Sequence, residues 1–200
     1  MKRKTAISAV ALAALTLSWP AVADETAASD RMIADFNSGQ KPGNIGGDFG
    51  AWIKDPTDPM QGAIDSFDHD NRYGSKGFAL RLIYSVQSNR PAFGGLWFKL
   101  GGLDASSYSG LAIRVKGDRA MGFSSTFKLE IKDELGQTSQ YLVNGVTDQW
   151  QDIVVPFDQF TGMANRHGLA ELVVILEDRT ASARQGVLYF DDVRLTGAPN

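Results

Sequence analysis

Apolar and polar residues alternate with a period of two along most of this chain, and the pattern is clearest in STFKLEIKDE, residues 125–134. In that segment Phe127, Leu129 and Ile131 fall on one face, and charged residues fall between them on the other. Successive side chains of a β-strand point to opposite faces, so this spacing predicts a strand with one buried and one solvated side. A chain with this pattern is expected to fold as antiparallel sheet.

Similar runs recur along the sequence, and turn residues separate them. Strands are expected at residues 32–37, 77–87, 95–100, 110–117, 125–134, 139–144, 150–155, 172–177 and 186–195. The Gly-rich segment 37–52 and the acidic segment 65–74 are expected to be loops, and only 156–160 and 163–171 could hold a helical turn. About nine or ten short antiparallel strands predict an all-β fold, a single β-sandwich or jelly roll.

The last expected strand, GVLYFDDVRL, contains an acid on its apolar face. Strict alternation places Asp192 on one face and Asp191 on the other, together with Val187, Tyr189, Val193 and Leu195. A carboxylate among apolar neighbours needs a counter-charge, a hydrogen-bond network or a metal ion. Asp191 is therefore expected to be either a structural residue held by hydrogen bonds or a cation ligand.

Residues 1–23 have the pattern of a secretory signal peptide. Three basic residues precede a short apolar run, and the small-residue triplet from Ala21 to Ala23 follows. Polar residues interrupt the run, whereas a retained membrane anchor would need about 20 continuous apolar residues. We expect cleavage before Asp24, a short lead at 24–30, one domain at 31–197, and a periplasmic or secreted protein that is not inserted in a membrane.

Composition excludes several classes of function. Loss of the three N-terminal basic residues changes the formal net charge from −3 to −6, which argues against nucleic acid or anionic lipid as a partner. The sequence contains no cysteine, so disulfides, thiol catalysis and thiolate zinc sites are excluded. His69 and His167 lie far apart and do not supply the usual zinc ligands. Any metal is expected to be a hard, oxygen-preferring ion such as calcium.

Seven segments occur in an order that resembles carbohydrate-binding modules of the family 11 type, which are galactose-binding-like jelly rolls. They are ADFNSG (34–39), NIGGDFGAW (44–52), GSKGFALRL (74–82), YSGLAIRVKGD (108–118), FKLEIKDELGQ (127–137), VTDQWQDIVVPFDQF (146–160) and GVLYFDDVRL (186–195). The match extends from about Ile33 to Leu195. This resemblance implies a non-catalytic exported module that binds a polysaccharide or oligosaccharide.

The resemblance also implies a structural calcium ion. Modules of this superfamily usually hold one between the first strand, the loop entering an early strand and the aspartate of the last strand. The corresponding positions in this chain are Asp35, the turn from Ser75 to Gly77, and Asp191. Carboxylate and carbonyl oxygens suit calcium. The alternative is that Asp191 accepts hydrogen bonds from backbone amides or from a buried arginine.

Sugar binding needs exposed aromatic faces for CH groups and planar polar groups for hydroxyls. Alternation places Trp97 opposite Leu96 and Phe98, and so on an outer sheet face. The other aromatic candidates are Tyr73, Tyr141 and Trp52, each with a core position as its alternative, and the outward basic candidates are Arg81, Arg114 and Lys128. The family's groove is rich in tyrosine, whereas this basic set favours a glycan with carboxylates, such as a uronic-acid polymer.

Catalysis is not expected. A glycosidase needs two carboxylates that face each other across a cleft, which Asp191 and Asp192 cannot supply from opposite faces of a strand. No nucleophile motif or phosphate-binding glycine loop is present. The alternative function is protein interaction or assembly in the cell envelope, since a related sandwich occurs in the complex I assembly-factor family. That family's Met-Gly-Gly signature does not follow Trp52. The partner would then be a separate envelope protein or a glycoside-active enzyme.

Overall fold

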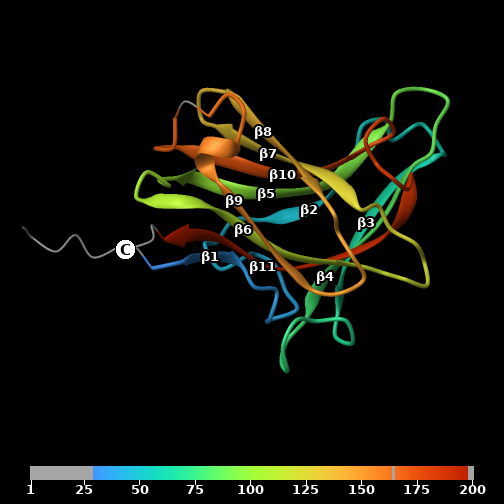
Figure 1. Cartoon of the computed structure of the whole chain (residues 1–200), viewed down its shortest axis with the longest axis horizontal. Helices are drawn as coiled ribbons and strands as arrows, with labels where there is room; N and C mark the ends of the chain where they lie inside the picture. The colour runs from blue at the N-terminus through green and yellow to red at the C-terminus, as the bar shows by residue number, and fades with distance from the viewer. Residues whose placement is uncertain (1–28, 164, 198–200) are drawn as a thin grey trace, which may run out of the picture.

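The computed structural model describes residues 29–163 and 165–197, which form two antiparallel sheets packed face to face (Figure 1). Sheet A contains β1 (Arg31–Ala34), β3 (Gln61–Asp68), β4 (Ala79–Val86), β6 (Tyr108–Gly117), β9 (Gln151–Pro156) and β11 (Gln185–Gly197). Sheet B contains β2 (Phe49–Ile53), β5 (Phe93–Leu103), β7 (Thr126–Asp133), β8 (Thr138–Asn144) and β10 (Leu169–Glu177). The predicted all-β sandwich is confirmed.

The strand order is β3-β4-β11-β6-β9 in sheet A, with β1 paired to the end of β11, and β2-β5-β10-β7-β8 in sheet B. The core lies between the sheets, where apolar residues of alternate positions meet. Phe127 of sheet B and Phe190 of sheet A, both fully buried, join the layers edge to face with ring centroids 5.8 Å apart. Such burial contributes about 25 cal/mol per Å² of apolar surface removed from water.

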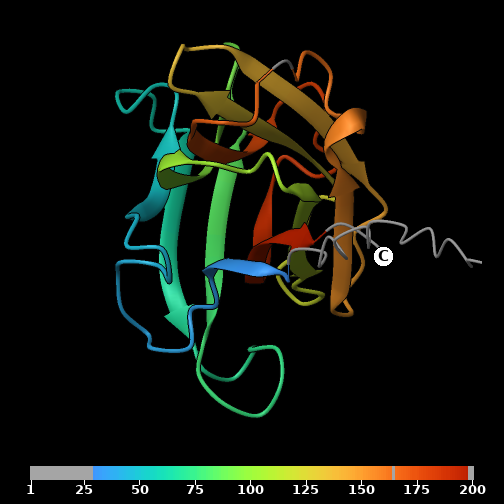
Figure 2. The same cartoon turned by 90° about the vertical axis from the view of Figure 1, so that its left-hand side faces the viewer.

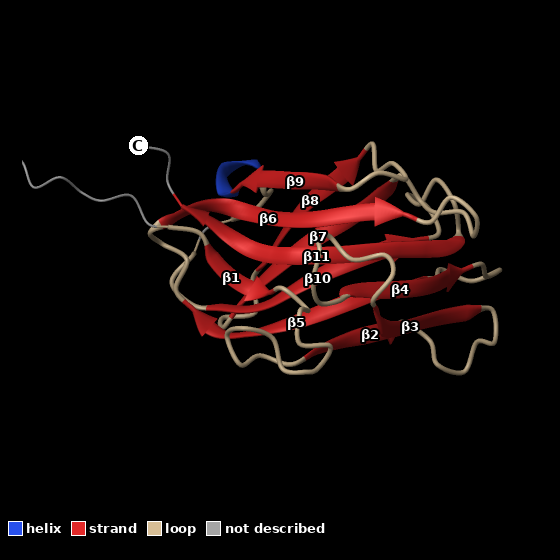
Figure 3. Cartoon of the chain, turned by 90° about the horizontal axis from the view of Figure 1, so that it is seen from below, coloured by secondary structure: helices blue, strands red, loops and turns tan. Residues whose placement is uncertain are grey.

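The described residues contain one short 3₁₀ helix, Phe157–Gln159, at the end of β9 (Figure 3). It lies in one of the two segments expected to turn. The other segment that could hold a helical turn, 163–171, forms none in its described residues, and its last three residues belong to β10. No helix in the described part of the chain has the length and apolar character needed to cross a membrane.

Two strands lie where loops were expected. β2 begins inside the segment 37–52 and extends one residue past it, and β3 overlaps the start of the segment 65–74. β3 is hidden in the sequence because Asp65 occupies a position that points toward β2. Its carboxylate accepts a hydrogen bond from the Ala51 N–H at 2.8 Å and pairs with Lys41 at 3.0 Å. An acid satisfied in this way breaks the apolar pattern without breaking the strand.

A bulge in β11 changes the expected position of Asp191. The register between β11 and β6 shifts after Asp191, and Asp192 has a φ of +43°. Leu188 and Phe190 face the core before the bulge, as Val193 and Leu195 do after it. The extra residue of a bulge reverses the alternation. The prediction that Asp191 shares a face with Val193 and Leu195 is therefore wrong.

Asp191 instead lies on the outer face of sheet A, opposite Arg114 of β6. It is nevertheless 3% exposed, because the loop between β3 and β4, which projects from the lower end of the sandwich in Figure 2, covers it. The Asp192 carboxylate also reaches Arg114, at 2.9 Å from Nε. The expectation that Asp191 and Asp192 point to opposite faces is thus also wrong.

Candidate functional site

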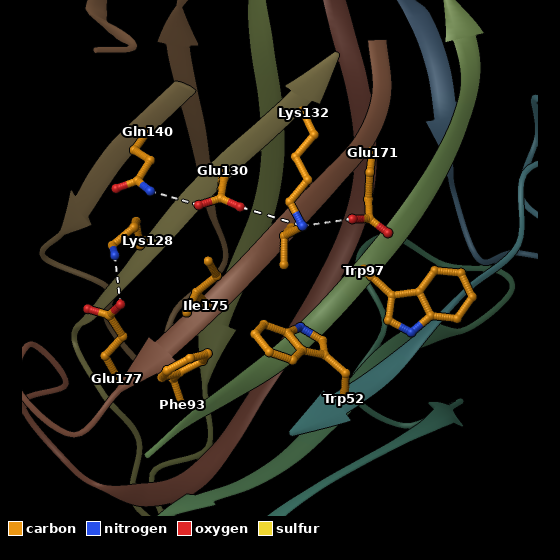
Figure 4. A pocket seen from close by; sticks show the side chains of 11 residues that line it. Trp52, Phe93, Trp97, Lys128, Glu130, Lys132, Gln140, Glu171, Ile175 and Glu177 are labelled. Atoms are coloured by element: carbon orange, nitrogen blue, oxygen red, sulfur yellow. Dashed lines mark hydrogen bonds and ion pairs between the residues drawn. The ribbon is translucent and has the colours of Figure 1, made fainter. Parts of the chain in front are cut away.

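The outer face of sheet B contains a groove with a volume of about 490 Å³ (Figure 4). All five strands of the sheet contribute to its lining. The centre of the groove is formed by small or medium side chains, because Gly95 of β5 pairs with Ile175 of β10, and Val173 lies two residues away. Longer side chains rise around this centre, and the difference in length makes the face hollow.

Aromatic residues form one side of the groove. Figure 4 shows Trp97, Trp52 and Phe93 in a row. Phe93 and Trp97 are four residues apart on one face of β5, which corresponds to about 13 Å. Trp52 on β2 is paired with Gly95 and fills the space between them, with its ring edge to face with Phe93 at 5.8 Å. The row offers a long apolar surface.

Gly50 determines how Trp97 lies. Gly50 of β2 is paired with Trp97, and a Cβ at this position would lie 3.2 Å from Cζ2 of the indole. The indole can therefore lie low over β2 because this position has no side chain. On the same face, the Lys99 ammonium lies 5.6 Å from the centre of the Trp97 ring.

Charged and amide side chains form the other side of the groove. Glu171 of β10 pairs in register with Lys99 of β5 and with Lys132 of β7, so the three side chains form a row across the sheet. The Glu171 carboxylate lies 2.7 Å from Lys99 Nζ and 3.1 Å from Lys132 Nζ. Lys132 Nζ is also 3.7 Å from Glu130, which accepts a hydrogen bond from Gln140 Nε2 at 2.7 Å.

A second ion pair lies at the end of the polar side of the groove, near Phe93. Lys128 Nζ lies 2.7 Å from the Glu177 carboxylate, and both side chains are largely buried. Each lysine that lines the groove thus has a glutamate partner within the sheet. The polar side can therefore donate and accept hydrogen bonds while its charges remain balanced.

The same ion pairs argue against glycosidase chemistry. Burial raises the pKa of Glu171, but hydrogen bonds from Lys99 and Lys132 outweigh it and hold that pKa below its ordinary value. A general acid must be protonated near neutral pH, and its pKa must therefore be raised. Lys132 lies between Glu130 and Glu171 and stabilises the ionised form of Glu171.

The structure brings three of the seven candidate ligand residues together, namely Trp97, Trp52 and Lys128. Tyr141 lies away from the groove. It is paired with Leu129, which faces the core, and its ring packs against Phe160 at 5.9 Å. The expected contact of Tyr141 with a ligand is therefore not supported in this groove, since its ring is partly buried and packs against the core.

The remaining candidates lie on sheet A or, for Tyr73, in the loop between β3 and β4 that covers its outer face. Arg81 is on β4, and the Arg114 guanidinium stacks 3.6 Å from the centre of the Tyr73 ring while pairing with Asp192. Arg81 and Arg114 thus lie on a different sheet from Lys128. The hypothesis of an acidic glycan loses its basis, because it required them to act together.

Sequence reasoning missed several groove residues, including Phe93, Lys132, Gln140, Glu171 and Glu177. Phe93 had a usable signal, because it is four residues before Trp97 on the same strand face. Glu171 and Glu177 had none, since the five residues from Leu172 to Leu176 are all apolar and show no alternation. Their positions follow only from the pairing of β10 with both of its neighbours.

The proposed metal position contains a buried carboxylate without a cationic partner among the described residues. Asp191 Oδ2 accepts a hydrogen bond from the Tyr73 N–H at 3.0 Å, and Oδ1 accepts one from the Asp192 N–H at 2.9 Å. Burial raises the pKa of Asp191 to about 7, and repulsion from Asp192 and Asp35 acts in the same direction. A cation beside Asp191 would stabilise the ionised carboxylate and so offset the unfavourable effect of its burial.

The other expected metal ligands are partly engaged. The Asp35 carboxylate accepts hydrogen bonds from the Asn37 N–H and from Asn44 Nδ2, each at 3.0 Å. The Ser75 carbonyl accepts one from Arg72 at 3.0 Å, and Gly77 has a φ of +79°. No group of three or more His, Asp or Glu side chains suited to an ion occurs in the described ranges. An ion beside Asp191 would therefore also need backbone carbonyls as ligands, which calcium accepts.

Solved structures of β-sandwich carbohydrate-binding modules share this fold. The family 11 module of the cellulosomal cellulase Lic26A-Cel5E of Clostridium thermocellum has a TM-score of 0.61 and 15% identity, over 85% of this chain and 95% of that one. A family 11 module from the same organism, in complex with a β-1,3-1,4-mixed-linked tetrasaccharide, has a TM-score of 0.62 and 15% identity, over 84% and 96%. The expected resemblance is confirmed at the level of the fold.

A more distant neighbour is the CBM22-1 xylan-binding domain of Xyn10C from Paenibacillus barcinonensis. Its TM-score is 0.53 and its identity 14%, over 86% of this chain and 97% of that one. No protein-family model and no curated protein matches the chain in sequence. The chain therefore shares its fold with β-sandwich carbohydrate-binding modules, and its function has to be argued from the residues of the groove.

Proposed function

We propose that this protein is a non-catalytic module that binds a neutral polysaccharide in the groove of sheet B. The observation that supports the proposal is that an aromatic row and a polar row face each other across one groove. The aromatic row of Trp97, Trp52 and Phe93 offers apolar faces to sugar CH groups, and the polar row opposite offers donors and acceptors to hydroxyls.

A neutral ligand suits the charges of the groove. Lys128, Lys132 and Lys99 are each held within 3.1 Å of a glutamate oxygen, so a glycan carboxylate would have to displace an existing ion pair. A hydroxyl can instead donate to the glutamates and accept from the lysines without displacing either. A family 11 neighbour of the same fold is in complex with a β-1,3-1,4-mixed-linked tetrasaccharide, which supports a glycan as the ligand.

Replacement of Trp97 tests the proposal. Trp97→Ala removes one end of the aromatic row, and loss of a tryptophan that contacts the ligand costs about 2 kcal/mol, or roughly 30-fold in affinity. Soluble polysaccharides in native affinity gels would identify a ligand, and calorimetry would give the dissociation constants. Tyr73→Ala, which removes an exposed aromatic on sheet A, is the matched control and should leave affinity unchanged. Equal binding by wild type and Trp97→Ala would contradict the proposal.

We also propose that a calcium ion binds beside Asp191 and stabilises the fold. Asp191 would supply a carboxylate, and backbone carbonyls of the Ser75–Gly77 turn and of the segment around Asp35 would complete the ligand set. Two non-glycine residues with positive φ, Phe36 (53°) and Asp192 (43°), directly follow Asp35 and Asp191. Strained backbone at both places supports a role beyond packing.

Thermal unfolding with and without a calcium chelator tests the metal. An ion that binds only the folded chain raises the unfolding midpoint by mass action, so addition of calcium after chelation should restore the midpoint of the wild type. Asp191→Asn should show no such response. If chelation leaves the wild-type midpoint unchanged, the calcium proposal fails.

Export is likewise a proposal, because the expected signal peptide at 1–23 lies outside the described residues. Its support is the sequence pattern alone. N-terminal sequencing of the protein recovered from an envelope or culture fraction should begin at Asp24, and a chain that retains its first residues would contradict cleavage.

The alternative of a protein-binding module has one supporting observation. Ile64 (63% exposed) and Met121 (60% exposed) line an apolar groove of about 310 Å³ on the outer face of sheet A. Affinity capture with Ile64→Asp as a control would distinguish the two functions. A partner lost with Ile64→Asp, together with no glycan retardation, would favour protein binding.

A further inference from the structure

A second, smaller cavity adjoins the groove. Its volume is about 210 Å³, and its lining includes Pro91, Asp178 and Arg179. It shares Phe93 and Glu177 with the groove, so the two hollows meet at this pair of residues. Figure 4 shows Phe93 and Glu177 at the end of the groove that lies farthest from Trp97. The aromatic row therefore leads toward the second cavity.

The walls of this cavity are anchored to the sheet. Phe93 and Glu177 form the last pair in the register of β5 with β10. Beyond them, the Asp178 N–H donates to the carbonyl of Ala92 at 2.9 Å, which ties the chain after β10 to the chain before β5. Pro91 and Arg179 extend from these two tied segments. The cavity is thus a continuation of the sheet face.

The chemistry of the second cavity differs from that of the groove. Arg179 is exposed, and its guanidinium makes no ion pair or hydrogen bond with any residue in 29–163 or 165–197. A guanidinium presents five N–H donors in a fixed plane, and Asp178 beside it supplies acceptor oxygens. Pro91 adds a flat apolar ring. Donors, acceptors and an apolar face are the groups that bind a sugar residue.

We infer that the glycan-binding site continues past Phe93 and Glu177 into this second cavity, where Pro91, Asp178 and Arg179 bind one further sugar residue of the same polysaccharide chain. The inference rests on the proposed function, because it extends that site. The cavity has less than half the volume of the groove, which suits a terminal subsite. Affinity should then depend on chain length beyond what the groove alone can hold.

Oligosaccharides of increasing length test the inference. The series, from disaccharide to octasaccharide, would be prepared from the neutral polysaccharide that the wild type retards in affinity gels. Calorimetry should show wild-type affinity rising with length until both cavities are filled. Arg179→Ala should lose the last increment, so that affinity for the longest ligands falls about tenfold, as expected for loss of a hydrogen bond to a charged group. Affinity for the shortest ligands that bind should not change.

Controls separate this inference from the proposed function. Arg119→Ala makes the same charge change at a side chain on the loop after β6 of sheet A, 89% exposed, and should bind every ligand as the wild type does. Circular dichroism would confirm that each variant is folded. If Arg179→Ala matches the wild type at every length while Trp97→Ala loses binding, the second subsite is wrong and the groove stands. A uniform loss at every length would also overturn the subsite, and a wild type that binds no glycan would overturn both.

Discussion

Gly50 is a residue at which the absence of a side chain shapes the groove of sheet B. Gly50→Val should push the Trp97 indole away from β2, because a Cβ there would lie 3.2 Å from Cζ2 and 3.3 Å from Lys41 Nζ. We expect glycan affinity to fall several-fold, since aromatic contacts depend on ring orientation. Gly62→Val on β3 is the control, because its Cβ would have no heavy atom within 4 Å. Calorimetry of both variants would show whether only the first weakens binding.

Asp191 should make stability depend on pH in the calcium-free protein. Its pKa is about 7 in the folded chain, against an ordinary value of 3.8, so the folded state retains a proton that the unfolded state loses between these values. The free energy of unfolding should therefore fall as pH rises from about 4 to about 7, by a few kcal/mol at ~1.4 kcal/mol per pKa unit.

Asp191→Asn should remove this dependence, since an amide does not titrate. Urea unfolding at several pH values in chelator would give the slopes, with Asp192→Asn as a second variant that leaves Asp191 titratable. Equal slopes for wild type and Asp191→Asn would show that another group is responsible. Bound calcium should flatten the wild-type slope as well, because the ion favours the ionised carboxylate.

β2 and β3 depend on each other although they belong to different sheets. Asp65 of β3 accepts a hydrogen bond from the β2 backbone at Ala51 and pairs with Lys41, so Asp65→Ala leaves a partly buried N–H without its partner. We expect a loss of about 1–3 kcal/mol in the free energy of unfolding. Glycan affinity should fall with it, because β2 contributes Trp52.

Urea unfolding and calorimetry would measure both effects, and Ser66→Ala, the next residue of β3 and exposed, is the control. A variant at Asp65 that loses stability but keeps full glycan affinity would show that Trp52 does not depend on this contact.

Element prediction from the sequence succeeded where one face is buried and the other solvated, as around Phe127 and Leu129. It failed for β3, where Asp65 points toward β2, and for the start of β10, where Glu171 separates Leu169 from the apolar run that begins at Leu172. Alternation also could not reveal the bulge after Asp191, because the reversal depends on how β11 pairs with β6.

For the molecule as a whole, the sequence indicated which side chains point outward but not which of the two sheets carries them. Trp97, Lys128 and Arg114 were all predicted to point outward, and the structure places the first two on sheet B and the third on sheet A. The order of strands in a sandwich depends on contacts between distant segments, which a period of two does not encode. The sequence could therefore predict which types of residue line the groove, but only some of the individual residues that do so.

The glutamates that line the groove give the whole molecule one more property. Because Lys99, Lys128 and Lys132 already have partners at 2.7–3.1 Å, the site exerts little net field on an approaching ligand. Raising ionic strength from 0.1 M to 1 M shortens the screening length from about 10 Å to about 3 Å, which weakens adhesion that depends on opposite charges. Here the dissociation constant for a neutral glycan should barely change between these salt concentrations. The proposed binding of a polysaccharide would then be as strong at high ionic strength as at low ionic strength.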